Sequence, residues 1–374
     1  MMLPVSKPSI GQEELSEVEK VFSTGWLGLG STVFDFENKL KDYLGAKHVL
    51  AVNTGTTALH IALDAFGIKD GDEVIVPSLT FCASIQAITA LGARPVFCEI
   101  NPNNLNIDIS DIKRRITNKT KVIMPVHYCG QACDMDELME IGKNHAIAII
   151  EDAAHAFGST YKGKKIGSFG DATCFSFDPI KNLTCGEGGA IALPDDAIAE
   201  LIRTKRILGI DKDTWHRYRN ERAWFYEVTM QGYRYHMSNI NAAIGLAQFR
   251  KVDSFIQKKK EIVQKYNDAF MNIEGLKILS WNVKETAPFT YIVRVLNGAR
   301  EDLIAFLKGK GVGTGIHYIP NHLQPFFRPF ATSLPITEQI GEEILTLPLY
   351  NDMTDRDVEL VIQSIISFFH HPAK

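Results

Sequence analysis

Short apolar runs alternate with amphipathic stretches through the first two thirds of the chain. The runs that predict strands are residues 48–52, 72–77, 94–100, 121–126, 146–150, 172–177 and 188–193. The stretches between them that predict helices are residues 56–66, 83–91 and 134–144. Almost wholly apolar strands separated by helices are typical of a mostly parallel sheet that is covered on both faces. The pattern therefore predicts an α/β fold, with a three-layer α/β/α large domain.

The two ends of the chain have a different pattern. The first 30 residues are expected to form an N-terminal arm, with one helix at residues 11–22 and a glycine-rich turn, GWLGLGS, and a second helix is expected at residues 34–43. From residue 239 a long helix is expected, which turns charged along its length. The elements predicted after it are strands at 291–296 and 314–319 and helices at 301–311 and 356–369. We expect residues 1–240 to form the arm and the large domain, and residues 241–374 to form a bridging helix and a smaller α+β domain.

Composition and charge exclude several classes of function. The chain has 374 residues, of which 45% are hydrophobic, and a formal net charge of −4. Its Lys and Arg residues are scattered, which disfavours a nucleic-acid groove or an anionic membrane surface. It lacks an apolar run of the roughly 18 residues that a membrane span needs, and its N-terminal segment lacks the apolar core of a signal peptide. A cytoplasmic protein is expected.

Six cysteines are spread along the chain, mostly in apolar segments, and are expected to be buried thiols. They are Cys82, Cys98, Cys129, Cys133, Cys174 and Cys185. The close pair, Cys129 and Cys133, lacks the CxxC spacing and a second pair of ligands. No metal site is predicted.

Two polar segments follow predicted strands, at the sheet edge where ligands of parallel α/β proteins bind. Residues 53–57, NTGTT, lead from a strand into a helix, and Gly55 would let an anion approach the free N–H groups of the helix start. An ordinary helix N-cap is the alternative. Residues 151–155, EDAAH, follow another strand, where an acidic side chain faces either the crevice or solvent.

The third segment, FSFDPIKNLTCGEGG, is the most informative of the three, because it contains a lysine in an unusual setting. Lys181 stands in a turn next to a proline and before several glycines, shortly after an apolar strand. A lysine amine can hold an aldehyde cofactor covalently and move protons. A carboxylate such as Asp152 can pair with a pyridinium nitrogen, and an aromatic side chain such as Phe81 can cover a ring. Together these parts indicate a pyridoxal-phosphate (PLP) enzyme, although Phe81 also fits a plain apolar helix start.

These motifs resemble the DegT/DnrJ/StrS nucleotide-sugar aminotransferases, a family of fold-type I PLP enzymes. The resemblance covers nearly the whole chain, through blocks that include NTGTTALHIAL, VPSLTFCAS, PVHYCGQACDMDEL, EDAAHAFGSTYKGKKIGSFGDATCFSFDPIKNLTCGEGGAIAL and IHYIPNHLQP. It implies a homodimer with active sites at the subunit interface.

The resemblance also implies a role for individual residues. Lys181 would be the Schiff-base lysine, Asp152 the partner of the pyridinium nitrogen and His155 a neighbour of the cofactor's phenolic oxygen. The phosphate would be held by Gly55, Thr56 and Ser176, and Phe81 would stack on the ring.

One motif departs from the family pattern. Many relatives have G-x-N-x-R-M, whose asparagine reaches the phosphate in the partner subunit, whereas this chain reads GYRYHM with Arg234 at the asparagine position. Arg234 is expected to bind an anion, either the cofactor phosphate or a sugar diphosphate. The segment with His317, Tyr318 and His322 resembles the loop that approaches the sugar, and ordinary loop packing is the alternative for both histidines.

The resemblance implies amino transfer from L-glutamate to a nucleotide-linked keto-deoxysugar, since a lysine stands where sugar dehydratases of the group have histidine. The loop favours the fourth carbon of a 4-keto-6-deoxyhexose, with the third carbon as the alternative. A non-catalytic PLP-fold regulator would not need Lys181. A nicotinamide dehydrogenase is disfavoured because GWLGLGS does not follow a strand.

Overall fold

In the computed structural model, which describes residues 2–210, 226–280 and 282–370, the chain is built around a seven-stranded sheet. The strands lie in the order β1-β9-β8-β5-β4-β2-β3. They are β1 His48–Val52, β2 Glu73–Pro77, β3 Arg94–Cys98, β4 Thr120–Ile123, β5 Ala148–Asp152, β8 Ala172–Ser176 and β9 Gly189–Leu193. β9 runs antiparallel to both neighbours, and the other pairs are parallel. The carboxyl ends of the parallel strands therefore share one edge.

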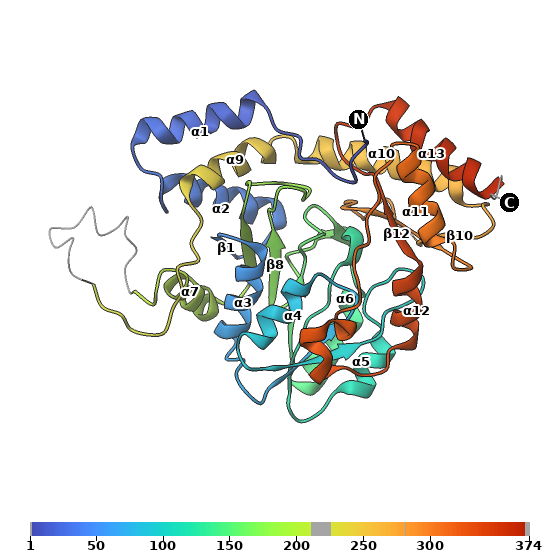
Figure 1. The fold of residues 1–374 in the computed structure, drawn as a ribbon. Helices are drawn as coiled ribbons and strands as arrows, with labels where there is room; N and C mark the ends of the chain where they lie inside the picture. The colour runs from blue at the N-terminus through green and yellow to red at the C-terminus, as the bar shows by residue number, and fades with distance from the viewer. Residues whose placement is uncertain (1, 211–225, 281, 371–374) are drawn as a thin grey trace.

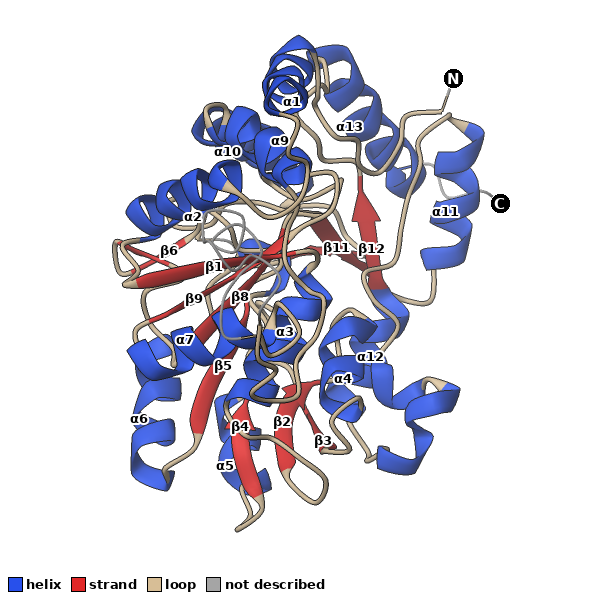
Figure 2. Cartoon of the chain, turned by 90° about the vertical axis from the view of Figure 1, so that its left-hand side faces the viewer, coloured by secondary structure: helices blue, strands red, loops and turns tan. Residues whose placement is uncertain are grey.

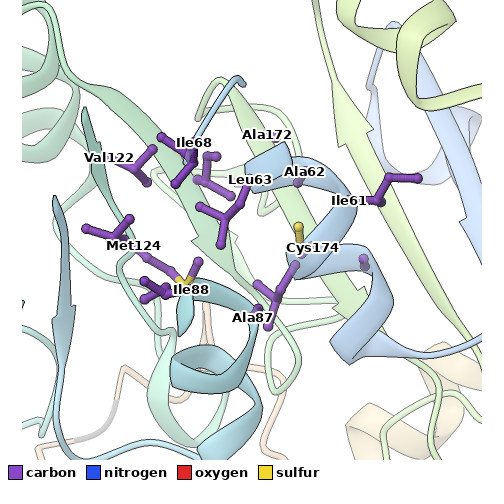
Figure 3. Close-up of a cluster of buried hydrophobic side chains, with 14 of the residues drawn as sticks. Ile61, Ala62, Leu63, Ile68, Ala87, Ile88, Val122, Met124, Ala172 and Cys174 are labelled. Carbon is purple, nitrogen blue, oxygen red and sulfur yellow. The ribbon is translucent and has the colours of Figure 1, made fainter. Parts of the chain in front are cut away.

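Helices cover both faces of this sheet (Figure 1). One face is covered by α3 Gly55–Ala65, α4 Cys82–Thr89 and α7 Asp196–Lys205. The other is covered by α2 Ser31–Leu44, α5 Ile109–Arg115 and α6 Met135–His145. Figure 3 shows how α3 and α4 place side chains such as Leu63 and Ile88 against Val122 and Met124 of the sheet region. These apolar contacts hold the helices against the sheet. They thereby keep in place the loops at the carboxyl ends of the strands.

A second, antiparallel sheet follows in the C-terminal part of the chain (Figure 2). Its strands, in the order β10-β11-β12, are β10 Leu276–Ile278, β11 Tyr291–Val295 and β12 Ile344–Leu347. The helices around it are α10 Val252–Phe270, α11 Arg300–Gly309, α12 Pro335–Glu343 and α13 Asp355–His370. The N-terminal end of the chain joins this part, because Leu3 packs into its core and pairs with Val312.

The described chain has a few further elements outside the two main sheets and their covering helices. The remaining helices are α1 Gln12–Thr24 and α9 Asn239–Phe249, with 3-10 turns at Tyr128–Gly130, Asn321–Leu323 and Pro325–Phe330. A small hairpin is formed by β6 Thr160–Tyr161 and β7 Lys164–Lys165. α9 lies between α1 and α2 in Figure 1 and packs against both. Among the described residues, no helix combines the length and the apolar character needed to cross a membrane.

The predicted α/β fold with a mostly parallel sheet is confirmed, and three details of the prediction are wrong. The long helix from residue 239 is interrupted at Arg250 and Lys251, which separate α9 from α10. Residues 314–319 are not a strand and make one isolated bridge, from Gly315 to Thr346 of β12. Cys82 is exposed at the start of α4, whereas the other five cysteines are buried as expected.

Candidate active site

Loops at the carboxyl ends of β1, β2, β5 and β8 surround a cavity of about 160 Å³. The residues that line it are Thr54, Gly55, Thr56, Leu59, Thr80, Phe81, Ala83, Val126, Asp152, Ala154, His155, Ser176, Asp178, Lys181 and Glu187. Residues from five separate segments of the sequence thus meet in one place. This is the edge at which an open α/β sheet binds its ligands.

Backbone hydrogen bonds join the two ends of the loop that carries Lys181. Phe177 N donates to Gly188 O, and Cys185 N donates to Phe177 O at 2.9 Å. Lys181 N donates to Asp178 O at 3.1 Å, so that the residues before the lysine form a turn. These bonds hold the lysine close to the end of β8.

The amine of Lys181 sits in a desolvated setting. Its Nζ lies 4.0 Å from the centre of the Phe289 ring. Desolvation lowers the pKa of Lys181 to about 8, against a smaller opposing effect of the Asp178 and Asp152 carboxylates. A lysine with this pKa is partly neutral near pH 7, and the neutral amine is the nucleophilic form.

Asp152 is the last residue of β5 and is 5% exposed. Its Oδ2 accepts a hydrogen bond from Ser84 Oγ at 2.7 Å, and its Oδ1 accepts from Ala154 N at 3.1 Å. Both donors are uncharged. Burial raises the pKa of Asp152, and these hydrogen bonds oppose the change. The site therefore holds a buried carboxylate that a cationic ligand group would stabilise.

His155 packs at the back of the cavity between aromatic rings. Its ring stacks on Phe289 with centroids 4.3 Å apart, and its Nε2 lies 3.0 Å from the Tyr318 hydroxyl. Burial, with the nearby Lys181 and His317, holds the pKa of His155 well below its usual range, so the ring is neutral. Its buried Nδ1 has no partner in the described part of the chain. If Tyr318 donates to Nε2, then Nδ1 carries the proton and can donate to a ligand oxygen.

The start of α3 forms the opposite wall. Thr54 caps this helix, because its Oγ1 accepts a hydrogen bond from Thr57 N at 3.1 Å. The helix start comes so close to β8 that a Cβ on Gly55 would lie 2.7 Å from the Cβ of Ser176. Gly55, Thr56 and Ser176 therefore face the cavity together, where the free N–H groups of the helix start can bind an anion.

Phe81 and Tyr318 border the mouth of the cavity. Phe81 precedes α4 and is 53% exposed. Its ring centre lies 5.5 Å from that of Tyr318. Next to Tyr318, the Nδ1 of His317 lies 2.9 Å from Thr346 Oγ1 of β12, and desolvation together with Lys181 lowers the pKa of His317 to about 4. The loop at 317–318 thus brings residues of the C-terminal part to the cavity.

Four of the predicted site residues do not line this cavity. His317 and Tyr318 lie beside it, since Tyr318 contacts the lining residues Phe81 and His155. His322 is 2% exposed, and its Nδ1 and Nε2 lie 2.7 Å from Ser78 Oγ and 3.3 Å from Glu338 Oε1. Both ring nitrogens are thus engaged in packing this loop, the alternative that we gave for His322. Arg234 lines a different hollow of about 310 Å³, together with Trp26 and His236.

Several residues that shape the site were not predicted from the sequence. Phe289, which supports both Lys181 and His155, lies in a loop before β11 and has no motif around it. Ser84 lies on α4 and reaches Asp152 across the sheet edge. Only the fold brings these residues to the cavity. Asp178 and Glu187 flank Lys181 in sequence, and their proximity to it was a usable signal.

The donor set of the cavity fits PLP. The amine of Lys181 suits an aldehyde, the buried carboxylate of Asp152 suits a protonated ring nitrogen, and the start of α3 suits a phosphate. The unpartnered Nδ1 of His155 suits a phenolic oxygen. In the described residues, no cluster of three or more His, Cys, Asp or Glu side chains is arranged to hold a metal ion.

The chain is similar to sugar aminotransferases along nearly its whole length. The model of the DegT/DnrJ/EryC1/StrS aminotransferase family matches residues 8–366. The spore coat polysaccharide biosynthesis protein SpsC of Bacillus subtilis is 40% identical over 375 residues, which cover 97% of this chain and 96% of SpsC. The aminotransferase TlmJ from Streptoalloteichus hindustanus superimposes with a TM-score of 0.94 at 32% identity over 100% of both chains.

A further solved structure bears on the cofactor. Spr1654 of Streptococcus pneumoniae, in its pyridoxamine-phosphate (PMP) form, superimposes with a TM-score of 0.93 at 30% identity over 98% of this chain and 99% of its own. Its PLP-form gives a TM-score of 0.92. The cofactor is PLP, and the chain belongs to the DegT/DnrJ/EryC1/StrS aminotransferase family.

Proposed function

We propose that this aminotransferase moves an amino group from L-glutamate to a keto group of a nucleotide-linked deoxysugar. The observation that carries the proposal is the meeting of the Lys181 amine, the buried Asp152 carboxylate and the start of α3 in one cavity. The chain is similar to SpsC, a spore coat polysaccharide biosynthesis protein, and this similarity supports a sugar substrate and a role in biosynthesis.

In this proposal, Lys181 and Asp152 are the main catalytic residues. PLP, when bound, supplies an electron sink for the carbon that exchanges the amino group. Lys181 Nζ would hold the cofactor and, once released from it, would move a proton from the donor's α-carbon to the cofactor carbon. In the second half of the cycle it would move a proton from the cofactor carbon to the sugar carbon that receives the amino group. Its lowered pKa lets it accept and give up protons near neutral pH. The Asp152 carboxylate keeps the ring nitrogen protonated by pairing with it in a desolvated setting.

The other cavity residues orient the cofactor. Gly55 and Thr56 offer the N–H groups of the helix start to the phosphate, and Ser176 adds a hydroxyl. The unpartnered Nδ1 of His155 would donate to the phenolic oxygen, and the exposed ring of Phe81 would cover one face of the cofactor ring. These residues would hold the phosphate and the ring, and so would orient the cofactor toward Lys181.

We assign the sugar to the mouth of the cavity, beside His317 and Tyr318. Both side chains are partly exposed there, and the desolvated, neutral imidazole of His317 can hydrogen-bond a sugar hydroxyl without a charge penalty. We further propose amination at the fourth carbon of a 4-keto-6-deoxyhexose, on the resemblance of this loop to that of enzymes with this regiochemistry. His322 is left out of the substrate contacts, because its ring is packed against Ser78 and Glu338.

We also propose a cytoplasmic homodimer in which each subunit contributes to its partner's site. Arg234 lies in a hollow apart from the chain's own cavity, where it could bind an anion held mainly by a second copy. Exposed apolar side chains lie near this hollow, among them Leu27 at 41% and Leu208 at 44% exposure. Burial of such side chains is a usual driving force for subunit association.

The test is turnover with defined keto-sugar nucleotides. The purified protein, loaded with PLP, is incubated with L-glutamate and either a 4-keto-6-deoxyhexose or a 3-keto-6-deoxyhexose nucleotide, and the product is analysed by NMR. The proposal predicts an amino group at the fourth carbon and formation of 2-oxoglutarate. Amination of the 3-keto compound alone would move the reaction to the third carbon. Amino transfer to neither sugar would contradict the proposed substrate class.

A further inference from the structure

A second buried lysine lies behind the loop of Lys181. Lys259 belongs to α10 and is 3% exposed, which is rare for a lysine. Its Nζ donates a hydrogen bond to Asn182 Oδ1 at 2.9 Å. This acceptor is uncharged, so the ammonium is buried against an amide rather than a carboxylate. Burying a charge in this way costs free energy and calls for an explanation.

Asn182 follows Lys181 directly and ties three loops together. Its Nδ2 donates to Ala287 O at 3.1 Å and to Phe157 O at 3.4 Å. The segment of Ala287 continues to Phe289, whose ring lies beneath the amine of Lys181. Lys259 thus hydrogen-bonds to Asn182, the residue that joins the loop of Lys181 to the segment of Phe289.

The charges of Lys259 and Lys181 interact. Desolvation lowers the pKa of Lys259 to about 8, and the like charge of Lys181 lowers it as well. Repulsion between two ammonium groups in a desolvated setting disfavours the doubly charged state. The charged or titratable groups around Lys181 are Asp178 on its own loop, Asp152 and His155 near β5, Glu187 before β9, His317 before β12 and Lys259 on α10.

We propose that Lys259 is a positioning residue whose charge, held in place by Asn182, favours the neutral form of the Lys181 amine. Of the surrounding groups, the carboxylates of Asp178 and Asp152 favour the protonated form. The Lys259 ammonium, hydrogen-bonded to Asn182 on the far side of the loop, opposes them as long as it is protonated. The inference rests on Lys181 being the reactive amine of the proposed function.

The test measures the titration of Lys181 in the unloaded protein. The protein is labelled briefly with acetic anhydride across a pH series, and the acetylated fraction of the Lys181 peptide is measured by mass spectrometry. Lys259→Gln removes the charge and retains a donor for Asn182. We expect it to raise the pKa of Lys181 by on the order of one unit, the size of a nearby charge effect in a partly desolvated site.

Two variants separate the effect of charge from that of packing. Lys259→Arg keeps the charge, and Lys258→Gln removes a charge from the same helix at a less buried position, so both should leave the titration of Lys181 unchanged. If Lys259→Gln does not fold, Lys259→Met serves, since its stem fills the same apolar space. A wild-type titration in the uncharged variant, or an equal shift in Lys259→Arg, would overturn the inference. Neither result depends on amino transfer, so a failure of the proposed function stays distinguishable.

Discussion

At Lys181, the burial that makes the amine reactive also makes its charge unfavourable. The amine lies over the ring of Phe289, and desolvation outweighs the attraction of Asp178 and Asp152. The result is a pKa of about 8, well below that of an exposed lysine. Burial also disfavours the charged form of Asp152, but for a carboxyl group this raises the pKa. A cation bound next to Asp152 would stabilise its charge.

The pKa of Lys181 sets the pH dependence of cofactor uptake. Because the pKa is lowered, the neutral amine dominates above about pH 8 and the ammonium below it. The rate of PLP incorporation into unloaded protein should therefore rise with pH and level off above about pH 8. It can be followed by the absorbance of bound cofactor in a stopped-flow series. A rate that levels off near pH 10, as for an exposed lysine, would contradict the desolvated setting.

Asp152→Asn should reduce amino transfer by about a hundredfold or more, because the charge that holds the ring nitrogen protonated is lost in a site of low dielectric. The amide keeps the shape of the side chain, so the protein should stay folded. Asp70→Asn, at an exposed position, is the matched control. Turnover is measured by 2-oxoglutarate release. Near-normal turnover of Asp152→Asn would assign the role to another group.

At the scale of elements, the site depends on how closely α3 approaches β8. The capped start of α3 was predictable from the NTGTT segment, because Thr54 is a good N-cap and a glycine follows it. The closeness to Ser176 was not, since it depends on the register of strands far apart in the sequence. Residues 314–319 were predicted as a strand from their local apolar pattern. In the structure they are not a strand, and they lead the chain to the cavity.

Gly55→Ala should weaken PLP binding by about tenfold or more. A Cβ at this position would meet Ser176 at 2.7 Å, and the helix start must move away from the phosphate position. Gly309→Ala is the control, because a Cβ there meets nothing within 4 Å and the residue also lies in a helix. Equilibrium titration with PLP gives both dissociation constants. Equal affinities in the two variants would contradict the close packing of α3.

At the scale of the whole molecule, two parts of the chain meet at the site. The residues that line the cavity come from the loops of the large sheet, and the C-terminal part supports them, because Phe289 packs against Lys181 and His155 and Tyr318 lies next to His155. The fold and the three motifs at the sheet edge could be predicted, because local patterns encode strands, caps and turns. The loop with His317 and Tyr318 was expected near the sugar only from the family resemblance, and the contacts that Phe289 and Ser84 make are long-range contacts that a single sequence does not display.

The shared-site dimer makes a prediction for mixed subunits. Lys181→Ala and Arg234→Ala each inactivate a homodimer if both residues are needed. A mixed dimer would contain one site with both residues intact, if Arg234 serves the partner's cavity. Random reassortment should then restore about one quarter of wild-type turnover. The activity of an equimolar mixture after subunit exchange checks this. No recovery, with exchange shown by native mass spectrometry, would place Arg234 in the site of its own subunit, and full activity of the Arg234→Ala homodimer would place it outside both sites.

The central claim is that Lys181 holds PLP and that the protein accepts an amino group from L-glutamate. The most direct test is the absorbance spectrum of the PLP-loaded protein before and after L-glutamate is added, with borohydride reduction and peptide mapping of a parallel sample. We expect the band of covalently bound cofactor to give way to that of pyridoxamine phosphate, and reduction before glutamate is added to attach the cofactor to Lys181. A band that L-glutamate does not change, or attachment at another lysine, would contradict the claim.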